Sequence, residues 1–500
     1  MRYRTAEQIN AIANQLALKL ELRRPEIRRH TDYVRGKRGT LRFASDEFKR
    51  YMADRFSSFA DNWCLPVAQA PVERMHFKGF IPYDDVRLGS NAIRCWDRND
   101  CDRGLQEAAL MMTTAARSFG LVTSRPDGLA RISFEHPDSC AVHYDALTGD
   151  IDAGFLVRRD DDNEYGTLLL PDTVFDVVRK RTGSDDERNR LEPNVNGWQF
   201  LPDTARPNPL GEVPLVEFRN QMLLDAIPLS DVEQVESMQD AVNVCWAYTL
   251  NALDFASMPA RVIMGGTKLV EPVFDRDGQQ VGERPANLDR QIMERIMQLT
   301  GPDVSIGEWT ASNLQAFLPV IEKAVEHIAA ETRTPGHYLL TNAEVPATGY
   351  EVAEAGLVSK TIERISFMRK PVRDLCRMAM RVENDSESAR IIADSRVMFA
   401  TPQYRSESLM ADAMLKYKEL GYPLQWIAES MGQSPEDIDR IMRMVRDEQS
   451  DPEMAEIARS LRIGDPNADT AATKPDGQPE TAGGDQPAGD QSRTQNMETR

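Results

Sequence analysis

The sequence lacks the long apolar run that a membrane-spanning helix needs. Its most apolar stretch, residues 241–253, contains Asn243 and Asn251 and falls short of the roughly 18 residues required. The first 24 residues mix charge into an amphipathic helical pattern and contain no apolar segment of the signal-peptide type. We therefore expect neither a membrane span nor secretion.

Cysteine and positive charge are also scarce. The six cysteines form no CxxC pair, so reduced thiols are expected. Lys and Arg number 60 against 79 Asp and Glu, which gives a formal charge of −19. The densest basic window, residues 23–42, is interrupted by Glu26 and Asp32. Proteins that bind DNA by neutralising phosphates are usually basic, so any DNA partner of this chain would not be held tightly.

The motifs of the common catalytic and metal sites are missing. No GxxxxGK[ST], HExxH or GxSxG occurs. His136, Cys140 and His143 fall in and beside a predicted strand, where residues 140 and 143 point to opposite faces, which argues against zinc. Twelve positions into a calcium-like loop that starts at Asp275 stands Ala286, where an EF-hand needs Glu. We expect no enzyme, no metal and no cofactor.

What is present is an ordinary globular composition, 41% hydrophobic and 28% charged. Residues 1–60 predict a helix, a turn and a second helix, and 99–119 predict a helix that stops at Gly120. Six β-like runs then alternate with turn clusters, which indicates an antiparallel α+β unit. The runs are 121–123, 131–134, 140–144, 154–158, 166–170 and 174–178.

The second half of the chain predicts long helices. Ser230 and Glu233 form a capping-box pattern that opens a helix reaching Pro259. A hairpin-rich segment follows, with turns at 262–266 and 274–278 and a short helix at 289–299. The second long helix spans 312–334, and Pro319 either kinks it or marks its start.

Polar, Pro- and Gly-containing residues 342–349 then separate this helix from a third one. Thr348 and Glu351 make a capping box for that helix, which runs to Val382 with an expected kink at Pro371. Residues 385–404 predict a short β segment and a linker, and 406–462 predict helices. Residues 464–500 hold seven acidic and three basic residues with Met497 as the only large apolar side chain, a composition typical of disorder.

Several different short motifs follow one another along the chain in a particular order. They are Asp61-Asn62-Trp63-Cys64, Glu73-Arg74-Met75, Lys78-Gly79-Phe80, Cys95-Trp96-Asp97-Arg98-Asn99, Arg117-Ser118-Phe119-Gly120, His143-Tyr144-Asp145, Val213-Pro214-Leu215-Val216 and Thr332-Arg333-Thr334-Pro335-Gly336-His337-Tyr338-Leu339. Together they resemble the portal proteins of tailed bacteriophages, in particular long-tailed phages that infect actinobacteria. The last motif is the most telling, because it ends a long helix where the family's channel loop begins. The likeness spans roughly residues 5–460.

The resemblance implies an α+β, mainly helical fold with the phage portal architecture of wing, stem, clip and crown. It implies a ring, normally a dodecamer, at one capsid vertex. The implied divisions are 1–230 wing, 231–258 and 312–340 stem helices, 259–311 clip, 341–349 channel (tunnel) loop, 350–404 kinked helix returning to the wing, 405–462 helical crown and 463–500 disordered acidic tail.

The resemblance also implies a function in the virion, after assembly in the host cytoplasm. Double-stranded DNA would pass through the ring during packaging and ejection without sequence specificity. In the channel loop, Asn342, Glu344 and Thr348 would face the DNA. In the clip, Asp275, Arg276 and Asp277 would face the terminase large subunit. Further implied partners are a head–tail adaptor and the major capsid or scaffolding protein. No contact with a membrane is implied.

Two physical features agree with these expectations. Two long helices that bracket a small module leave apolar stripes that neighbouring subunits of a ring could bury. An acidic wall would repel phosphates and let DNA slide. The alternatives are a head–tail adaptor or minor capsid protein and, less favoured, a soluble enzyme with its site in residues 62–230.

Overall fold

A computed structural model describes most of the chain. The described residues are 5–37, 41–56, 59–83, 91–160, 163–180, 197–225, 227–257, 261–266, 270–275, 278–285, 296–299, 301–308, 317–339, 350–403 and 407–450. The chain divides into one unit of residues Met1–Ile438 and a second of Asp439–Arg500. Of the second unit, the description covers only the part of helix α15 (Pro435–Ser450) that follows Ile438.

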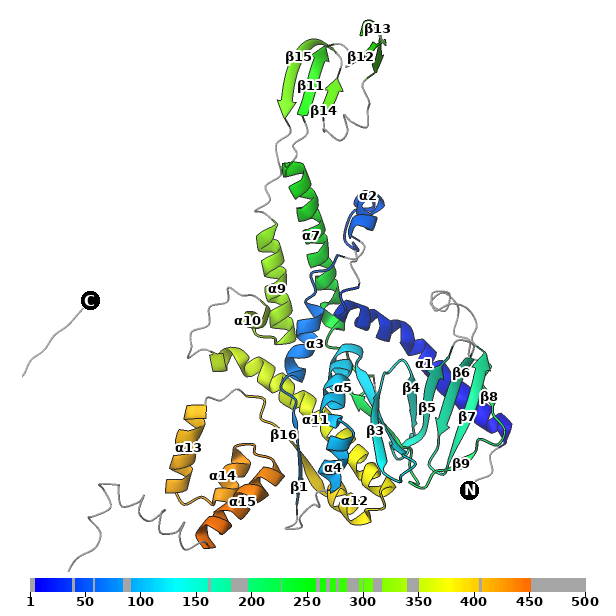
Figure 1. The fold of residues 1–500 in the computed structure, drawn as a ribbon, viewed down its shortest axis with the longest axis vertical. Helices are drawn as coiled ribbons and strands as arrows, with labels where there is room; N and C mark the ends of the chain where they lie inside the picture. Colours follow the sequence, from blue (N-terminus) through cyan, green and yellow to red (C-terminus); the bar gives the residue numbers. More distant parts are fainter. Residues whose placement is uncertain are drawn as a thin grey trace, which may run out of the picture. The chain divides into compact units, whose positions relative to one another are not determined.

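Helices and strands both occur in the first half, whereas helices dominate the last third (Figure 1). The helices are α1 (Ala6–Val34), α2 (Asp46–Phe56), α3 (Cys64–Val72), α4 (Asn91–Arg98), α5 (Cys101–Ala115), the 3₁₀ turn η1 (Glu233–Val235), α7 (Glu236–Ser257), α9 (Leu318–Thr332), α10 (Gly336–Leu339), α11 (Tyr350–Val382), α12 (Ser386–Ala393), α13 (Glu407–Glu419), α14 (Leu424–Ser430) and α15. The strands are β1 (Phe77–Pro82), β2 (Arg117–Ser124), β3 (Ala130–Glu135), β4 (Cys140–Tyr144), β5 (Ile151–Arg159), β6 (Asn163–Leu169), β7 (Thr173–Lys180), β8 (Gln199–Phe200), β9 (Arg206–Pro207), β10 (Leu215–Arg219), β11 (Arg261–Gly266), β12 (Val270–Phe274), β13 (Gln280–Pro285), β14 (Ile296–Leu299), β15 (Gly301–Glu308) and β16 (Ser395–Phe399).

Four of the six predicted runs are confirmed as an antiparallel meander, whereas the first two, 121–123 and 131–134, lie in β2 and β3 of a separate three-stranded sheet. Strands β4 to β8 follow one another in a six-stranded sheet, in which β9 also pairs with β7. Helix α1 covers this sheet, because its apolar positions recur at helical spacing and pack on Phe155 and Trp198. The Thr5 hydroxyl accepts a hydrogen bond from the Gln8 amide at 3.3 Å, and the Gln8 side chain accepts one from the Thr5 amide at 3.1 Å. This capping box fixes where α1 begins.

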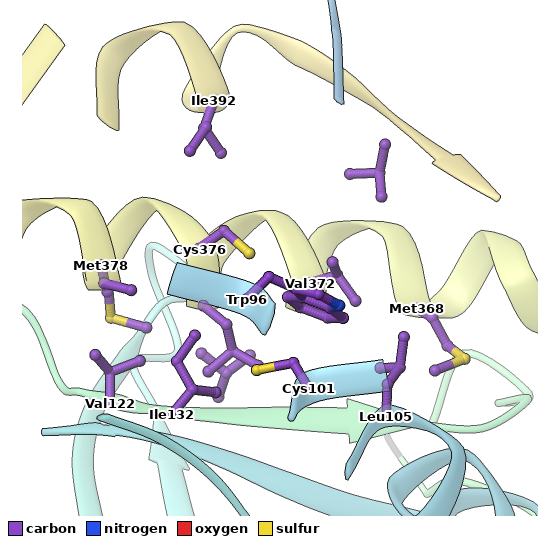
Figure 2. Close-up of a cluster of buried hydrophobic side chains, with 14 of the residues drawn as sticks. Trp96, Cys101, Leu105, Val122, Ile132, Met368, Val372, Cys376, Met378 and Ile392 are labelled. Atoms are coloured by element: carbon purple, nitrogen blue, oxygen red, sulfur yellow. The ribbon is translucent and has the colours of Figure 1, made fainter. Parts of the chain in front are cut away.

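Helix α11 is the central element of a second core. Figure 2 shows Met368, Val372 and Cys376 of α11 facing Trp96 and Cys101 of the α4–α5 region. Strands β10, β2 and β3 form a three-stranded sheet on the same core, and α12 packs on α11 as well. The fold is therefore α+β and mainly helical, as predicted.

The helix predicted over 99–119 is shorter than expected. It ends at Ala115, because Ala116 adopts a left-handed conformation (φ 65°) and the residues that follow pair with β10 and β3. Gly120 is thus not a helix stop. A Cβ added to it would lie 2.6 Å from Leu375 Cδ1, so glycine here permits the close approach of α11 to the sheet.

The structure corrects three other local predictions of secondary structure. Residues 386–393 form helix α12 and not extended chain, because the Asp385 carboxylate accepts a hydrogen bond from the Ser388 amide at 3.0 Å and so caps the helix. The short β segment predicted in the same region is present as β16, which pairs with β1. Residues 296–299 form strand β14, parallel to β11, and not part of a helix. Residues 262–266 lie within β11, the middle strand of a three-stranded sheet, and are not a turn.

The second long helix starts at Leu318, within the described part of the chain. Pro319 lies in its first turn, where a missing amide costs nothing, so this proline marks a helix start and not a kink. The helix ends at Thr332, and a short break at Arg333–Pro335 separates it from α10. In the described residues, no helix is both long enough and apolar enough to cross a bilayer.

Candidate functional site: an anchored helix pair

Helices α7 and α9 form an antiparallel pair, which we call the helix pair (Figure 1). The near end, where α7 begins and α9 finishes, is buried in a core with Tyr33, Cys64 and Leu339. Val325 and Ile328 of α9 belong to the same core and are at most 1% exposed. Anchoring is therefore concentrated at one end of the pair.

The buried face of α7 carries several polar side chains beside its apolar ones. Gln239, Asp240 and Asn243 are each at most 2% exposed. The Tyr33 hydroxyl donates to both carboxylate oxygens of Asp240 at 2.9 and 3.0 Å, and the Asn243 side-chain oxygen accepts from the Asp61 amide at 3.0 Å. The apolar periodicity that predicted this helix gave no sign of these contacts, which hold α7 to the end of α1 and to the chain before α3.

A buried ionic group joins both near ends of the pair to α11. We call Asp231, Lys360 and Arg364 the anchor cluster; each residue is at most 4% exposed. Asp231 lies 2.8 Å from Arg364 Nη2 and 3.1 Å from Lys360 Nζ, and it accepts from Asn220 Nδ2 at 3.0 Å. Lys360 also donates to the carbonyl oxygen of Thr332, the last residue of α9, at 3.2 Å. One turn of α11 thus fixes the start of α7 and the end of α9.

Electrostatics keep the Asp231 carboxylate of the anchor cluster ionised. Burial alone raises the pKa of Asp231, but the charges of Lys360 and Arg364 outweigh burial and bring the net pKa below its ordinary value of 3.8. Burial lowers the pKa of Lys360, and the charge of Arg364 adds to this effect, while Asp231 opposes it. The sequence signal for this cluster is the presence of charges at positions 360 and 364, spaced i and i+4 on a helix face that also carries Leu357.

A second ionic group holds the segment after α9. Arg74 pairs with Glu354 of α11 at 3.0 Å and donates to the Tyr338 hydroxyl at 2.6 Å. His337 Nε2 lies 3.6 Å from the same Glu354. The Thr332–Leu339 motif, singled out from the sequence, is therefore tied to both α11 and the turn after α3.

A third group of charges lies between α1 and the start of α7. His30 is 2% exposed, and its ring nitrogens lie 2.6 Å from Glu236 and 3.7 Å from Glu26. Glu26, His30 and Glu233 are close enough to hold a metal ion. However, Arg29 already contacts Glu233 at 3.4 Å and Glu236 at 3.1 Å, so the charge of these carboxylates is balanced by a guanidinium and a histidine. This arrangement fits a protonated imidazole better than a metal centre.

The far end of the helix pair exposes apolar and acidic side chains. Leu253 near the end of α7, and Leu318 and Val320 at the start of α9, are 42%, 47% and 54% exposed. The exposed charged side chains of α9 include three carboxylates, Glu322, Glu326 and Glu331, but one lysine, Lys323, which pairs with Glu326. The pair is thus anchored at one end and presents unburied apolar surface at the other.

The predicted site residues are only partly described. Asn342, Glu344 and Thr348 of the predicted channel loop lie outside the described residues, as do Arg276 and Asp277 of the predicted clip. Asp275 is exposed in the turn between β12 and β13, where its carboxylate accepts from the Gln279 amide at 3.0 Å and Gly278 has φ 76°. The hairpin predicted at 274–278 is confirmed.

A cleft of about 760 Å³ lies where the alternative enzyme site was expected, between the β4–β5 turn, β10 and α11. Several of its charged side chains are already paired in the structure. Glu217 pairs with Arg117 and accepts from the Tyr144 hydroxyl, each at 2.8 Å. Glu212 binds Arg377 and Arg381 at 2.6 and 2.5 Å. These ion pairs join β10 and the preceding turn to their neighbours, as expected of structural contacts.

Comparison with known families shows that this chain, with its helix pair, the strand module (strands β11–β15) that the pair brackets and the long α11, is a phage portal protein. Residues 71–416 match the family model described as phage portal protein, SPP1 Gp6-like, and the chain belongs to this family. The function that membership implies is that of a portal, a channel for DNA at a capsid vertex.

Individual relatives carry the same description. The portal protein of Mycobacterium phage D29 is 24% identical over 366 residues, which cover 69% of each chain. The portal protein of Mycobacterium phage L5 is 23% identical over 291 residues, 56% of this chain and 58% of the relative. Among solved structures, a chain from the neck of a native gene transfer agent particle computed with C12 symmetry is 13% identical with a TM-score of 0.41 and covers 78% of this chain and 94% of its own length.

Proposed function

We propose that this chain assembles into a closed ring in the virion, with the helix pair as its stem. The observation that carries the proposal is the apolar far end of the pair, where Leu253, Leu318 and Val320 remain about half exposed. Neighbouring copies in a ring cover such a surface through a heterologous contact. A dodecamer is the number that the family resemblance favours.

Mass measurement of the purified protein tests the ring. We expect a single large species at micromolar concentration, and we expect Leu253→Asp with Val320→Asp to shift it toward the monomer. Leu147→Asp is the matched control, because Leu147 is 96% exposed in the β4–β5 turn, away from the pair. A wild-type chain that remains monomeric would overturn the ring.

We propose further that double-stranded DNA passes along this ring without being bound tightly. The net charge of −19 and the acidic exposed face of α9 support this, since carboxylates repel phosphates and avoid the counterion release that holds DNA on a basic surface. Within the predicted channel loop, Asn342, Glu344 and Thr348 are the residues proposed to face the DNA.

Glu344→Lys tests the channel loop. The new ammonium groups would contact phosphates, so the amount of DNA packaged per procapsid should fall more at low salt than at high salt, because salt screens such contacts. Glu344→Gln is the control that removes charge without adding a cation. Equal packaging by wild type and Glu344→Lys at every salt concentration would place the loop away from the DNA.

The strand module between α7 and α9 is the proposed docking face for the terminase large subunit. Its β12–β13 turn exposes Asp275, and Arg276 and Asp277 follow in the sequence. Charge reversal at these three positions should weaken terminase binding and leave the mass of the ring unchanged. Unchanged terminase binding by the charge-reversed variants would mean that the docking face lies in another part of the protein. A head–tail adaptor and the major capsid or scaffolding protein are further proposed partners, and assembly is proposed to take place in the host cytoplasm.

A further inference from the structure

Arg74 binds three segments that are far from it in the sequence. Its Nη2 donates to the Tyr338 hydroxyl of α10 at 2.6 Å and pairs with Glu354 of α11 at 3.0 Å. Its Nη1 donates to the carbonyl oxygen of Pro402, which precedes α13, at 3.1 Å. His337 Nε2 lies 3.6 Å from the same Glu354. We call Arg74, His337, Tyr338 and Glu354 the Arg74 clamp.

The two contacts of Nη2 lie on either side of the predicted channel loop, residues 341–349. Tyr338 lies just before this segment, and Glu354 lies one turn into the helix that follows it. The residues that separate α10 from α11 could span roughly 33 Å if they were extended. One nitrogen atom instead holds a group from each side of the segment.

The start of α11 has few other contacts to hold it. No side chain described before Leu357 in this helix is buried, and Val352 is 79% exposed. Most helical stability in proteins comes from packing of an apolar face, and the first two turns of α11 have no such packing among their described side chains. The contacts of Glu354 with Arg74 and His337 therefore place these turns.

Arg74 itself is held firmly. It lies in the turn after α3, between Val72 and Met75, which are 4% and 1% exposed and belong to one core. The Met75 amide donates to the Val72 carbonyl at 2.9 Å and closes the turn. The planar guanidinium presents donors in several fixed directions, whereas a lysine carries a single compact charge. Arginine is thus the side chain that can bind all three segments from this position.

These contacts lead from a buried core to both sides of the predicted loop. Resting on the proposed channel loop, we infer that Arg74 is a positioning residue of the DNA channel, which fixes both flanks of residues 341–349 relative to the core around α3. A loop whose two flanks are fixed keeps its place when DNA passes it. Loss of Arg74 should therefore impair packaging while the ring still forms.

Hydrogen–deuterium exchange of full-length rings tests the Arg74 clamp directly. In Arg74→Gln, amides of residues 336–339 and 354–358 should exchange about tenfold faster than in wild type, the size expected when a charge-assisted hydrogen bond is lost. Arg103→Gln is the control, because Arg103 pairs with Asp100 at an exposed site and contacts neither flank. Unchanged exchange at both flanks in Arg74→Gln would overturn the inference.

Two conservative variants show which property of Arg74 matters. Arg74→Lys keeps a charge beside Glu354 but loses the second donor, so residues 336–339 should still exchange faster than in wild type. Full protection of both flanks in Arg74→Lys would mean that charge alone suffices and would overturn the bridging role. Tyr338→Phe removes only the hydroxyl of a side chain that is 39% exposed, so it leaves the core intact and should speed exchange of residues 336–339. Unchanged exchange there would also overturn the inference.

Packaging separates a positioning role from a purely structural one. The DNA packaged per procapsid should fall severalfold in Arg74→Gln, while the mass of the ring stays the same. In rings that lack residues 342–348, Arg74→Gln should have no further effect, because Arg74 acts through the loop. An equal fall with and without the loop would overturn the inference. Rings that package normally without the loop would instead refute the proposed channel loop and not the clamp.

Discussion

Replacing Asp231 by Asn gives the sharpest test of the anchor cluster. The change keeps the size of the side chain but removes the negative charge that Lys360 and Arg364 share at 3.1 and 2.8 Å. The nearest remaining carboxylate is Glu363, which is 37% exposed and 3.3 Å from Arg364. Arg364 would then keep one partly solvated carboxylate, and Lys360 would keep the carbonyl oxygen of Thr332.

The expected loss of unfolding free energy is about 3–5 kcal/mol, the usual cost of removing one partner of a buried pair. The unit that holds the cluster, Met1–Ile438, has an unfolding entropy of about 0.9 kcal/mol/K, so the melting temperature should fall by about 3–5 °C. Asp412→Asn is the matched control. It breaks an ion pair of similar length whose side chains are 60% and 68% exposed, so it should change stability by under about 1 kcal/mol.

Two further measurements show whether the loss of stability in Asp231→Asn comes from the lost charge or from a change in packing. The pKa of Asp231 in the folded protein lies below its ordinary value, so its stabilisation is present above that value and is lost as the pH falls through the folded pKa. The difference between wild type and Asp231→Asn should therefore shrink in acid. The triple change Asp231→Leu, Lys360→Met and Arg364→Met should recover much of the loss, since apolar groups replace the whole cluster. If Asp231→Asn melted like Asp412→Asn near neutral pH, the reasoning would be refuted.

Three other outcomes are expected. Burial lowers the pKa of His30 and so does nearby Arg29, but hydrogen bonds to Glu236 and Glu26 outweigh both, and the net pKa lies above 6.5. The extra stability of wild type over His30→Gln should therefore be complete below pH 6.5 and should disappear as the pH rises through the folded pKa. A stability difference that stays constant in thermal melts from about pH 5 to 9 would contradict this. Gly120→Ala should lower the unfolding free energy by about 1–3 kcal/mol in urea titrations, because the added methyl group clashes with Leu375. Gly282→Ala is the control and should leave the unfolding free energy nearly unchanged, because no atom lies within 4 Å of the added Cβ. Equal effects of the two substitutions would refute the close-packing argument. Tyr33→Phe should cost about 1.5–3 kcal/mol by removing the donor to buried Asp240, and an unchanged melting temperature would show that this bond does not hold α7.

Elements whose signals are local could be predicted from the sequence alone. Period-two runs placed β4 within its observed bounds, and the apolar spacing and Pro335 placed the end of α9 within a few residues. The Ser230 hydroxyl accepts from the amides of Val232 and Glu233 at 3.0 and 3.3 Å, but the predicted capping box is not formed, because the Glu233 side chain contacts Arg29 and the 3₁₀ turn η1 precedes α7. Such signals depend on neighbours a few residues away, so they can be seen without the fold.

Tertiary contacts decided the remainder. The residues after Ala115 became a strand because β10 and β3 lie on either side of them, and Gly120 is required because α11 crosses the sheet at Leu375. Asp231 meets Lys360 and Arg364 from more than 120 residues away. No local pattern fixes such a pairing, because a buried charge is tolerated only where the folded chain brings its partner to it.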